Sequence, residues 1–360
     1  MKNFLKVCVA LSFLAIVFVG CNNNGNSSKT NSALNSSAAE KVYVAPGEHD
    51  EFYGFVSGGF SGQLAVYGLP SGRLFKVIPV FSTDAEKAWG YNEETKPMLN
   101  TSHGFIPWDD SHHPDISQTT GEIDGRWVFI NANNTPRIAK IDLSVFETTE
   151  IIEIPNSAGN HSSSFVTENT EYVVAGTRFS VPVPQRDMPI AEYKGNFKGA
   201  LTFIAVDPED GGMEIDFQIL MPGFNYDLSH PGRDKSHGWF FFSTYNSEEA
   251  STLLEVNASQ NDKDFIAAVN WKKIKEYVDN GGGTMMPANY AHNVYDEKTH
   301  MATSTMKKEV RVVNPTDIPG AVYLLPTPKS PHGCDVDPSG EYIVGSGKLS
   351  ANLTVHSFTN

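Results

Sequence analysis

Cysteine is scarce in this 360-residue chain, and its scarcity excludes a fold held together by several disulfide bonds. Two of the three cysteines, Cys8 and Cys21, lie in the N-terminal segment, and Cys334 is the third. Cys334 is therefore expected to be a free thiol. No nearby cation would stabilise its thiolate, so we predict that it is a small buried apolar side chain rather than a metal ligand.

Basic residues are also few. The chain has 27 lysines and arginines against 42 acidic residues, a net charge of −15, and no basic cluster outside its first residues. Because binding to a phosphate backbone requires a basic face, we predict no nucleic-acid partner. The length and an apolar content of 40% suit one large globular domain or two ordinary ones.

Long apolar runs are limited to Val7 to Val19, which two lysines precede. This run is shorter than a membrane span of about 20 residues and is typical of a secretory signal. The tetrapeptide Phe18-Val19-Gly20-Cys21 resembles the lipobox of bacterial lipoproteins, with Phe in place of the usual Leu. We expect a signal peptide at residues 1–20, lipidation of Cys21, and a periplasmic or otherwise extracytoplasmic protein anchored to the membrane by lipid. An uncleaved anchor is the alternative.

The remainder divides by composition into a tether and a folded domain. Residues 21–41 are rich in Asn and Ser and cannot bury enough apolar surface to offset the entropy of ordering them. Residues 42–360 contain runs of four to seven β-branched and aromatic residues separated by Gly, Pro, Asn and Asp, which predicts an all-β domain. A single helix is predicted from Lys272 to Asn280, ending before three consecutive glycines.

One order of features recurs along the domain: a histidine, a turn rich in acids and Gly or Asn, an apolar strand, a polar turn and a second strand. It begins at His113, His161 and His332, and a strand also follows directly after His237. Radial repetition of antiparallel sheets, as in a β-propeller, protects the strand edges of a large all-β protein and leaves a central channel. A β-sandwich is the alternative architecture.

Histidines placed just before successive inner strands of a propeller would converge at one mouth of its channel. The adjacent His112 and His113, in Asp109-Asp-Ser-His-His-Pro114, occupy such a position, as do His161 and His332. Neutral imidazole is a common ligand of copper, zinc and iron. We therefore group these four histidines as one metal site, with Asp109 or Asp110 as hydrogen-bond partners that fix the imidazole tautomers. A hydrolytic carboxylate pair formed among Asp109, Asp110 and Asp115 is the disfavoured alternative, because no sugar-binding aromatic run accompanies these acids.

Several motifs in consistent order resemble nitrous oxide reductases, from about Val42 to the end of the chain. The matching segments are Asp110-Ser-His-His-Pro114, Asn131-Ala-Asn-Asn-Thr-Pro-Arg-Ile-Ala139, Gly238-Trp-Phe-Phe-Phe-Ser-Thr-Tyr-Asn-Ser-Glu248 and Ser330-Pro-His-Gly-Cys334. The absence of an Arg-Arg pair before the apolar run suggests the branch of the family exported by the general secretory route. His112, His113, His161 and His332 match four of the seven histidines that hold the catalytic copper in that family.

The resemblance implies a seven-bladed propeller with a sulfide-bridged four-copper cluster, joined to a C-terminal cupredoxin domain with a dinuclear copper centre. The implied reaction is the two-electron reduction of N2O to N2 and water by a homodimer, with electrons from a cytochrome c or a small copper protein. It also implies a structural calcium ion bound at Tyr245, Glu248, Val256, Asp262 and Ser330. Ser330 stands where relatives have Asn, and Asp264 could replace Asp262 as a ligand.

The sequence ends at Asn360, before the later part of the family pattern. We expect the N-terminal part of the propeller, without three cluster histidines and without the cupredoxin domain, and a fragment that is inactive alone. A lipid-anchored, non-catalytic β-propeller that binds a protein or small ligand is the alternative function. We assign His230 and His237, which flank a Pro-Gly-Arg-Asp-Lys segment, to loop or core hydrogen bonds.

Overall fold

The computed structural model describes residues 37–247, 264–327 and 330–360. The chain divides into two compact units, Met1–Glu48 and His49–Asn360. In the first unit, the one-turn helix α1 (Ala38–Lys41) begins with a capping box between Ser37 and Glu40. Within the described ranges, no helix combines the length and the apolar character needed to cross a membrane.

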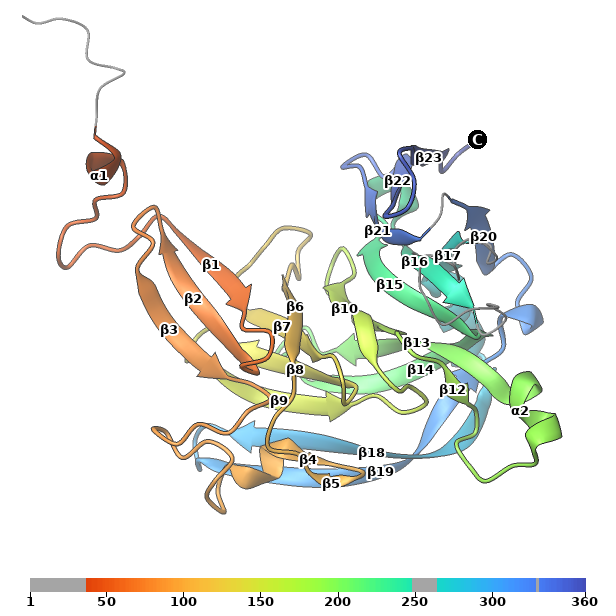
Figure 1. The fold of residues 1–360 in the computed structure, drawn as a ribbon, viewed down its shortest axis with the longest axis horizontal. Helices are drawn as coiled ribbons and strands as arrows, with labels where there is room; N and C mark the ends of the chain where they lie inside the picture. Colours follow the sequence, from red (N-terminus) through yellow and green to blue (C-terminus); the bar gives the residue numbers. More distant parts are fainter. Residues whose placement is uncertain (1–36, 248–263, 328–329) are drawn as a thin grey trace, which may run out of the picture. The chain divides into compact units, whose positions relative to one another are not determined.

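The second unit consists mainly of antiparallel meanders, in which each strand pairs with the next along the chain (Figure 1). The described residues form five of them. The strands of the first two are β1 (Phe52–Ser57), β2 (Gln63–Leu69) and β3 (Leu74–Pro79), then β6 (Ser111–Ile116), β7 (Trp127–Ala132), β8 (Arg137–Asp142) and β9 (Glu147–Glu153). The third contains β10 (Asn160–Val166), β11 (Tyr172–Thr177), β13 (Phe197–Val206) and β14 (Met213–Pro222). The last two contain β15 (Phe224–Pro231), β16 (Trp239–Ser247), β17 (Phe265–Asn270) and β20 (Val322–Pro326), then β21 (Pro331–Val336), β22 (Tyr342–Gly347) and β23 (Leu353–Ser357).

Smaller elements connect or extend these meanders. They are the short strands β4 (Asn100–Thr101), β5 (Gly104–Phe105) and β12 (Val181–Pro182), the helix α2 (Ile190–Asn196), and the 3-10 helices η1 (Lys96–Leu99), η2 (Asp234–Ser236) and η3 (Pro315–Asp317). The predicted helix is present as α4 (Trp271–Asp279), with the Asn270 side chain accepting a hydrogen bond from the backbone N–H of Lys273. After α4 the backbone changes direction at Gly281, whose φ of +85° is accessible to glycine at low cost.

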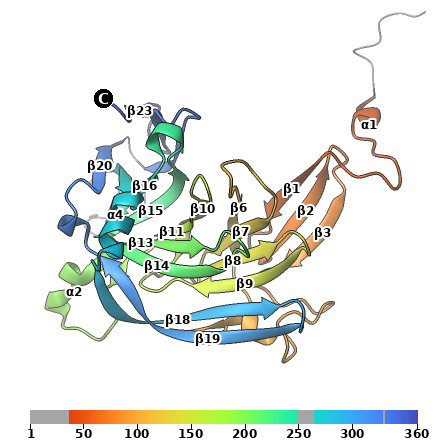
Figure 2. The same ribbon diagram turned by 180° about the vertical axis from the view of Figure 1, so that it is seen from behind.

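A long hairpin, β18 (Thr284–Asp296) and β19 (Met301–Val313), interrupts the fourth meander between α4 and β20. β18 pairs antiparallel with β9, and β19 pairs parallel with β14, so that the hairpin joins the outer strands of the second and third meanders into one 11-stranded sheet. Figures 1 and 2 show the hairpin in light blue alongside these strands. The hairpin therefore covers two sheet edges that would otherwise be open to pairing with other chains.

Apolar side chains fill the spaces between successive meanders. In β7, Val128 and Ile130 belong to the cluster shared with the first meander, whereas Trp127 and Phe129 belong to the cluster shared with the third. Further clusters lie between the third and fourth meanders and between the fourth and fifth. Because each central sheet buries both faces, its strands read as continuous apolar runs rather than as an alternating pattern.

The first strands of consecutive meanders lie against one another: β1 contacts β6, β6 contacts β10, β10 contacts β15, and β15 contacts β21. Meanders stacked face to face with their first strands side by side are the blades of a propeller. The prediction of an all-β propeller fold is confirmed. The described residues supply five such units, and the count of seven blades stays a prediction.

Candidate metal centre

The four predicted histidines lie on the first strands of three meanders, the second, the third and the fifth. β6 carries His112 and His113, β10 carries His161, and β21 carries His332. The expectation that they precede the inner strands in loops is wrong, because each is part of an inner strand itself. The apolar runs recognised in the sequence, such as Trp127–Asn131, are the second strands of their meanders.

Each of these histidines coincides with an irregularity in strand pairing. The register of β6 against β7 shifts between His112 and Asp115, that of β10 against β11 shifts around His161, and that of β21 against β22 shifts around His332. Consecutive side chains of a regular strand point to opposite faces. The bulge in β6, where His113 has a φ of +32°, allows both adjacent imidazoles to lie on the same side.

Three of the imidazoles form a compact group. The ligand atoms of His112, His113 and His161 all lie within 4.8 Å of one another, and the Nε2 atoms of His113 and His161 are 3.2 Å apart. The ring centroid of His332 lies 6.3 Å from that of His161, and His332 is exposed. Within the group His161 is buried, whereas the side chain of His112 is 33% exposed.

Burial favours the neutral form of two of these imidazoles, His112 and His113. It is the main cause that lowers the pKa of His113 to about 3, and the neighbouring His161, His112 and His332 add to the effect. Burial and His161 also lower the pKa of His112. Neutral imidazole retains the lone pair that a metal ion needs, whereas imidazolium has none.

A carboxylate that the sequence analysis missed orients His161. Asp227 lies on β15, the first strand between β10 and β21, at another register shift, and its Oδ1 is 2.6 Å from His161 Nδ1. Its side chain is 2% exposed. This bond assigns the proton to Nδ1 and directs the Nε2 lone pair toward His113. No sequence motif marks Asp227, since it is a single acid in a stretch of aromatic and polar residues.

The acids expected to support the histidines have different partners. Asp109 is fully enclosed and accepts hydrogen bonds from Asn134, Thr135 and the buried guanidinium of Arg137, so its assignment as a partner of the histidines is wrong. Asp110 Oδ1 lies 3.7 Å from His112 Nδ1, which is beyond a direct hydrogen bond. Asp110 is therefore close to the cluster, and Asp109 serves the β7–β8 turn.

The donor set fits a copper, zinc or iron ion. All side chains of the compact group offer imidazole nitrogen, the ligand type that these metals share. His112 Nδ1 is buried and has no hydrogen-bond partner among the described residues, although buried polar atoms are nearly always paired. Coordination to a metal ion or a hydrogen bond with an ordered water would satisfy that atom.

Most of the predicted calcium ligands cannot be placed. Glu248, Val256 and Asp262 lie outside the described residues, as does the side chain of Tyr245. Ser330 is buried with a φ of +54°, and its backbone N–H donates a 2.7 Å hydrogen bond to Asp264 Oδ2. The calcium site stays a prediction.

The two other histidines that were assigned to hydrogen bonds have such bonds. His237 Nδ1 lies 2.7 Å from Glu168 Oε2, and its Nε2 lies 3.4 Å from Glu171 Oε1. His230 Nδ1 lies 2.8 Å from the carbonyl oxygen of Pro231. Neither histidine belongs to the compact group.

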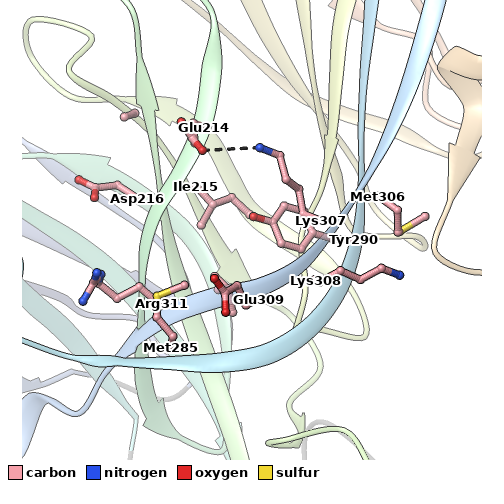
Figure 3. Close-up of a pocket in the computed structure, with 12 residues that line it drawn as sticks. Glu214, Ile215, Asp216, Met285, Tyr290, Met306, Lys307, Lys308, Glu309 and Arg311 are labelled. Atoms are coloured by element: carbon pink, nitrogen blue, oxygen red, sulfur yellow. Dashed lines mark ion pairs between the residues drawn. The ribbon is translucent and has the colours of Figure 1, made fainter.

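A groove of about 660 Å3 lies between β14 and the β18–β19 hairpin (Figure 3). Charges of both signs line it, and Lys307 Nζ approaches Glu214 Oε1 to 3.6 Å across it. None of the four clustered histidines lines this groove. The groove and the histidine cluster are therefore separate features.

No protein-family model matches the chain. Comparison with individual known proteins does find relatives. The chain is 31% identical over 320 residues, 88% of its length, to the nitrous-oxide reductase of Pseudomonas fluorescens, of which it covers 46%. The nitrous-oxide reductase of Stutzerimonas stutzeri is 31% identical over 319 residues, with the same coverage of both chains. The chain spans about half the length of the curated relatives it matches.

Two solved structures have a weaker likeness. Hydrazine synthase of Kuenenia stuttgartiensis has a TM-score of 0.42 at 12% identity, over 85% of this chain and 80% of that chain. The Dos1 propeller has a TM-score of 0.35 at 9% identity, over 83% of this chain and 69% of that chain.

Proposed function

We infer that this chain, a homologue of nitrous-oxide reductases over about half of their length, is part of a copper-dependent oxidoreductase that reduces N2O. The observation that carries the proposal is the group formed by His112, His113 and His161, whose ligand atoms lie within 4.8 Å of one another. The nitrous-oxide reductase of Pseudomonas fluorescens matches this chain over 88% of the chain's length.

His112, His113, His161 and His332 would hold the copper. Copper supplies one-electron redox chemistry when bound. The protein contributes neutral nitrogen ligands fixed on three strands of a rigid scaffold, so that little reorganisation is needed when metal binds. Burial keeps the imidazole of His113 unprotonated at neutral pH and even in moderate acid.

Asp227 would act through His161 rather than on substrate. Its carboxylate accepts a hydrogen bond from Nδ1–H, which fixes the ring orientation and the tautomer and makes Nε2 a stronger electron-pair donor to metal. The reduction consumes two electrons and two protons and yields N2 and water, with electrons delivered by a cytochrome c or small copper protein.

Further features of the proposed protein rest on its sequence. We propose export through the signal at residues 1–20, a lipid anchor at Cys21, and a calcium ion near Ser330. We also propose that the active form is a homodimer. Each subunit of it would include regions equivalent to the part of the relatives that this chain does not match.

The proposal is tested first by copper binding. Anaerobic titration of the metal-free chain with Cu(I) should show tight binding, with imidazole nitrogen as the nearest neighbour in X-ray absorption spectra. His113→Ala should lower the number of copper ions bound per chain or weaken the affinity for Cu(I) at least tenfold. His103→Ala, which changes an exposed histidine in a loop, is the matched control and should bind like wild type.

Copper content in His113→Ala equal to that of wild type would refute the ligand assignment. A wild-type chain that binds no copper would favour the alternative of a non-catalytic binding protein. In the native organism, the His113→Ala allele should abolish N2O consumption, whereas the His103→Ala allele should leave it unchanged.

A further inference from the structure

A small cavity lies between the first meander, the second meander and the end of β18. Its volume is about 110 Å3, and its walls come from the end of β3, the segment that precedes η1, the β8–β9 turn and Tyr295 of β18. A dry cavity of about 150 Å3 can hold benzene, so this one suits a slightly smaller molecule. None of the four clustered histidines lines it. The cavity is therefore separate from the candidate metal centre.

Three aromatic side chains, Trp89, Phe146 and Tyr295, line this one cavity. The rings of Trp89 and Tyr295 meet edge to face, with centroids 6.0 Å apart and an interplanar angle of 70°. The ring of Phe146 is braced from behind by Phe75, at a centroid distance of 5.3 Å. Aromatic faces attract cations, and several rings around one space are the usual receptor for a methylated ammonium group. The walls of the cavity therefore suit an N-methylated cation.

One acid and one base complete the lining, Glu147 and Lys87. Both are exposed residues, so they stand at the edge of the cavity. Lys87 Nζ donates a 3.2 Å hydrogen bond to the carbonyl of Val77, and neither charged group forms an ion pair within the described part of the chain. The edge thus offers one carboxylate and one ammonium to a ligand that carries charges of both signs.

The indole N–H of Trp89 is available to a hydrogen-bond acceptor. Trp89 is 7% exposed, and its Nε1 is buried without a partner among the described residues, although buried polar atoms are nearly always paired. The two threonine hydroxyls in the lining are already engaged. Thr95 donates to the carbonyl of Ala88 at 3.0 Å, and Thr148 donates to that of Pro79 at 2.8 Å. A ligand with an anionic oxygen would complete the bonding of the indole.

We propose that this cavity binds a small zwitterion that carries both an N-methylated ammonium and a carboxylate. The methylated ammonium lies against the three rings and close to the Glu147 carboxylate. The carboxylate of the ligand accepts hydrogen bonds from the indole N–H of Trp89 and from the Lys87 ammonium. Binding needs no metal and none of the clustered histidines, so it is independent of the copper chemistry proposed above.

Glycine betaine is the probe, titrated into the metal-free full chain. Calorimetry should show saturable binding, and the Trp89 indole signal of 15N-labelled protein should shift with the same affinity. That signal is identified among those of the five tryptophans by its loss in Trp89→Phe. Tetramethylammonium chloride and sodium acetate each carry only one of the two charged groups. Each should bind about tenfold more weakly than glycine betaine or not at all.

Substitutions in the lining should weaken binding of glycine betaine by amounts that follow their contacts. Tyr295→Leu removes one ring and should weaken it about tenfold. Glu147→Gln and Lys87→Gln each remove one exposed charge and should weaken it about threefold. Glu86→Gln is the matched control, since Glu86 is an exposed acid next to Lys87 that does not line the cavity, and it should bind like wild type.

The proposal is overturned if the wild-type chain shows no saturable binding of glycine betaine. It is also overturned if Glu147→Gln and Lys87→Gln both bind the probe like wild type; these two residues are exposed, so their variants remain informative even if Tyr295→Leu does not fold. Equal affinity for tetramethylammonium and glycine betaine would show a site for cations alone and would refute the zwitterion.

Discussion

Removal of the Asp227 carboxylate should weaken copper binding without removing a ligand. Asp227 Oδ1 lies 2.6 Å from His161 Nδ1, and the side chain is 2% exposed, so that little water can replace it. Hydrogen bonds to a charged group contribute about 1.5–3 kcal/mol. Loss of a partner that orients a metal-bound histidine costs about 10- to 100-fold in metal affinity, or about 1.4–2.8 kcal/mol. The two ranges agree.

We therefore expect Asp227→Ala to weaken Cu(I) binding by about 100-fold and Asp227→Asn by about tenfold. The asparagine oxygen can still accept a hydrogen bond from Nδ1–H, but it lacks the charge of the carboxylate. The assay is an anaerobic competition between the protein and a chromophoric Cu(I) chelator. Asp335→Asn is the matched control, because Asp335 lies on the neighbouring inner strand β21 with an 89% exposed side chain.

Two outcomes would refute this reasoning. An Asp227→Ala protein that binds Cu(I) within twofold of wild type would show that the carboxylate does not support a ligand. Equal weakening in Asp335→Asn would show a general effect of negative charge around the channel. Cooperative thermal unfolding of each variant verifies that the fold is retained, since an unpaired buried Nδ1–H itself destabilises by about 1–3 kcal/mol.

Three further predictions concern the framework of the site. Asp109→Asn should lower the free energy of unfolding by about 3–5 kcal/mol, because it leaves the fully buried Arg137 guanidinium without its counter-charge, and denaturant titration at neutral pH measures this. Burial opposes ionisation of Asp124, but four hydrogen bonds within the β6–β7 turn outweigh it and lower its pKa to about 2. Its folded pKa is below the unfolded value of about 3.9, so its contribution to stability is present above pH ~4 and is lost as the pH falls through about 2. Asp124→Asn should cost about 1 kcal/mol at pH 7, after allowance for solvent screening, and clearly less at pH ~2. Burial raises the pKa of Cys334, which is 5% exposed, so in a variant without the other two cysteines a thiol reagent should label it only after unfolding, and rapid labelling of the native protein would contradict its burial.

The sequence predicts the central strands well and the outer ones poorly. Trp127 to Asn131 bury both faces of their sheet, and such apolar runs are recognisable without tertiary information. β18 contains Pro287, Asn289 and His292, which disfavour strands locally, and its extended form depends on pairing with β9 and β19. Strands stabilised by distant partners leave little trace in a local pattern.

The sequence likewise predicts which histidines meet, but not how they do so. His112, His113, His161 and His332 were grouped by their order relative to turns and strands, and the structure brings the first three within ligand distance of one another. The bulges that direct them were not predictable, because one extra residue in a strand has no compositional signature. Asp227 was missed for the same reason, since its function depends only on a neighbour 66 residues away.

The β18–β19 hairpin has a consequence for how the chain folds. It is inserted late in the chain, yet His292 lies opposite Ile152 in β9, and Val312 lies opposite Gln218 in β14. The second and third meanders can therefore acquire their final edges only after the chain has reached residue 313. Contacts of such high sequence separation slow folding, because the entropy of closing long loops must be lost before the pairing stabilises anything. Once formed, they make the second and third meanders a single cooperative unit that resists local opening around the histidines.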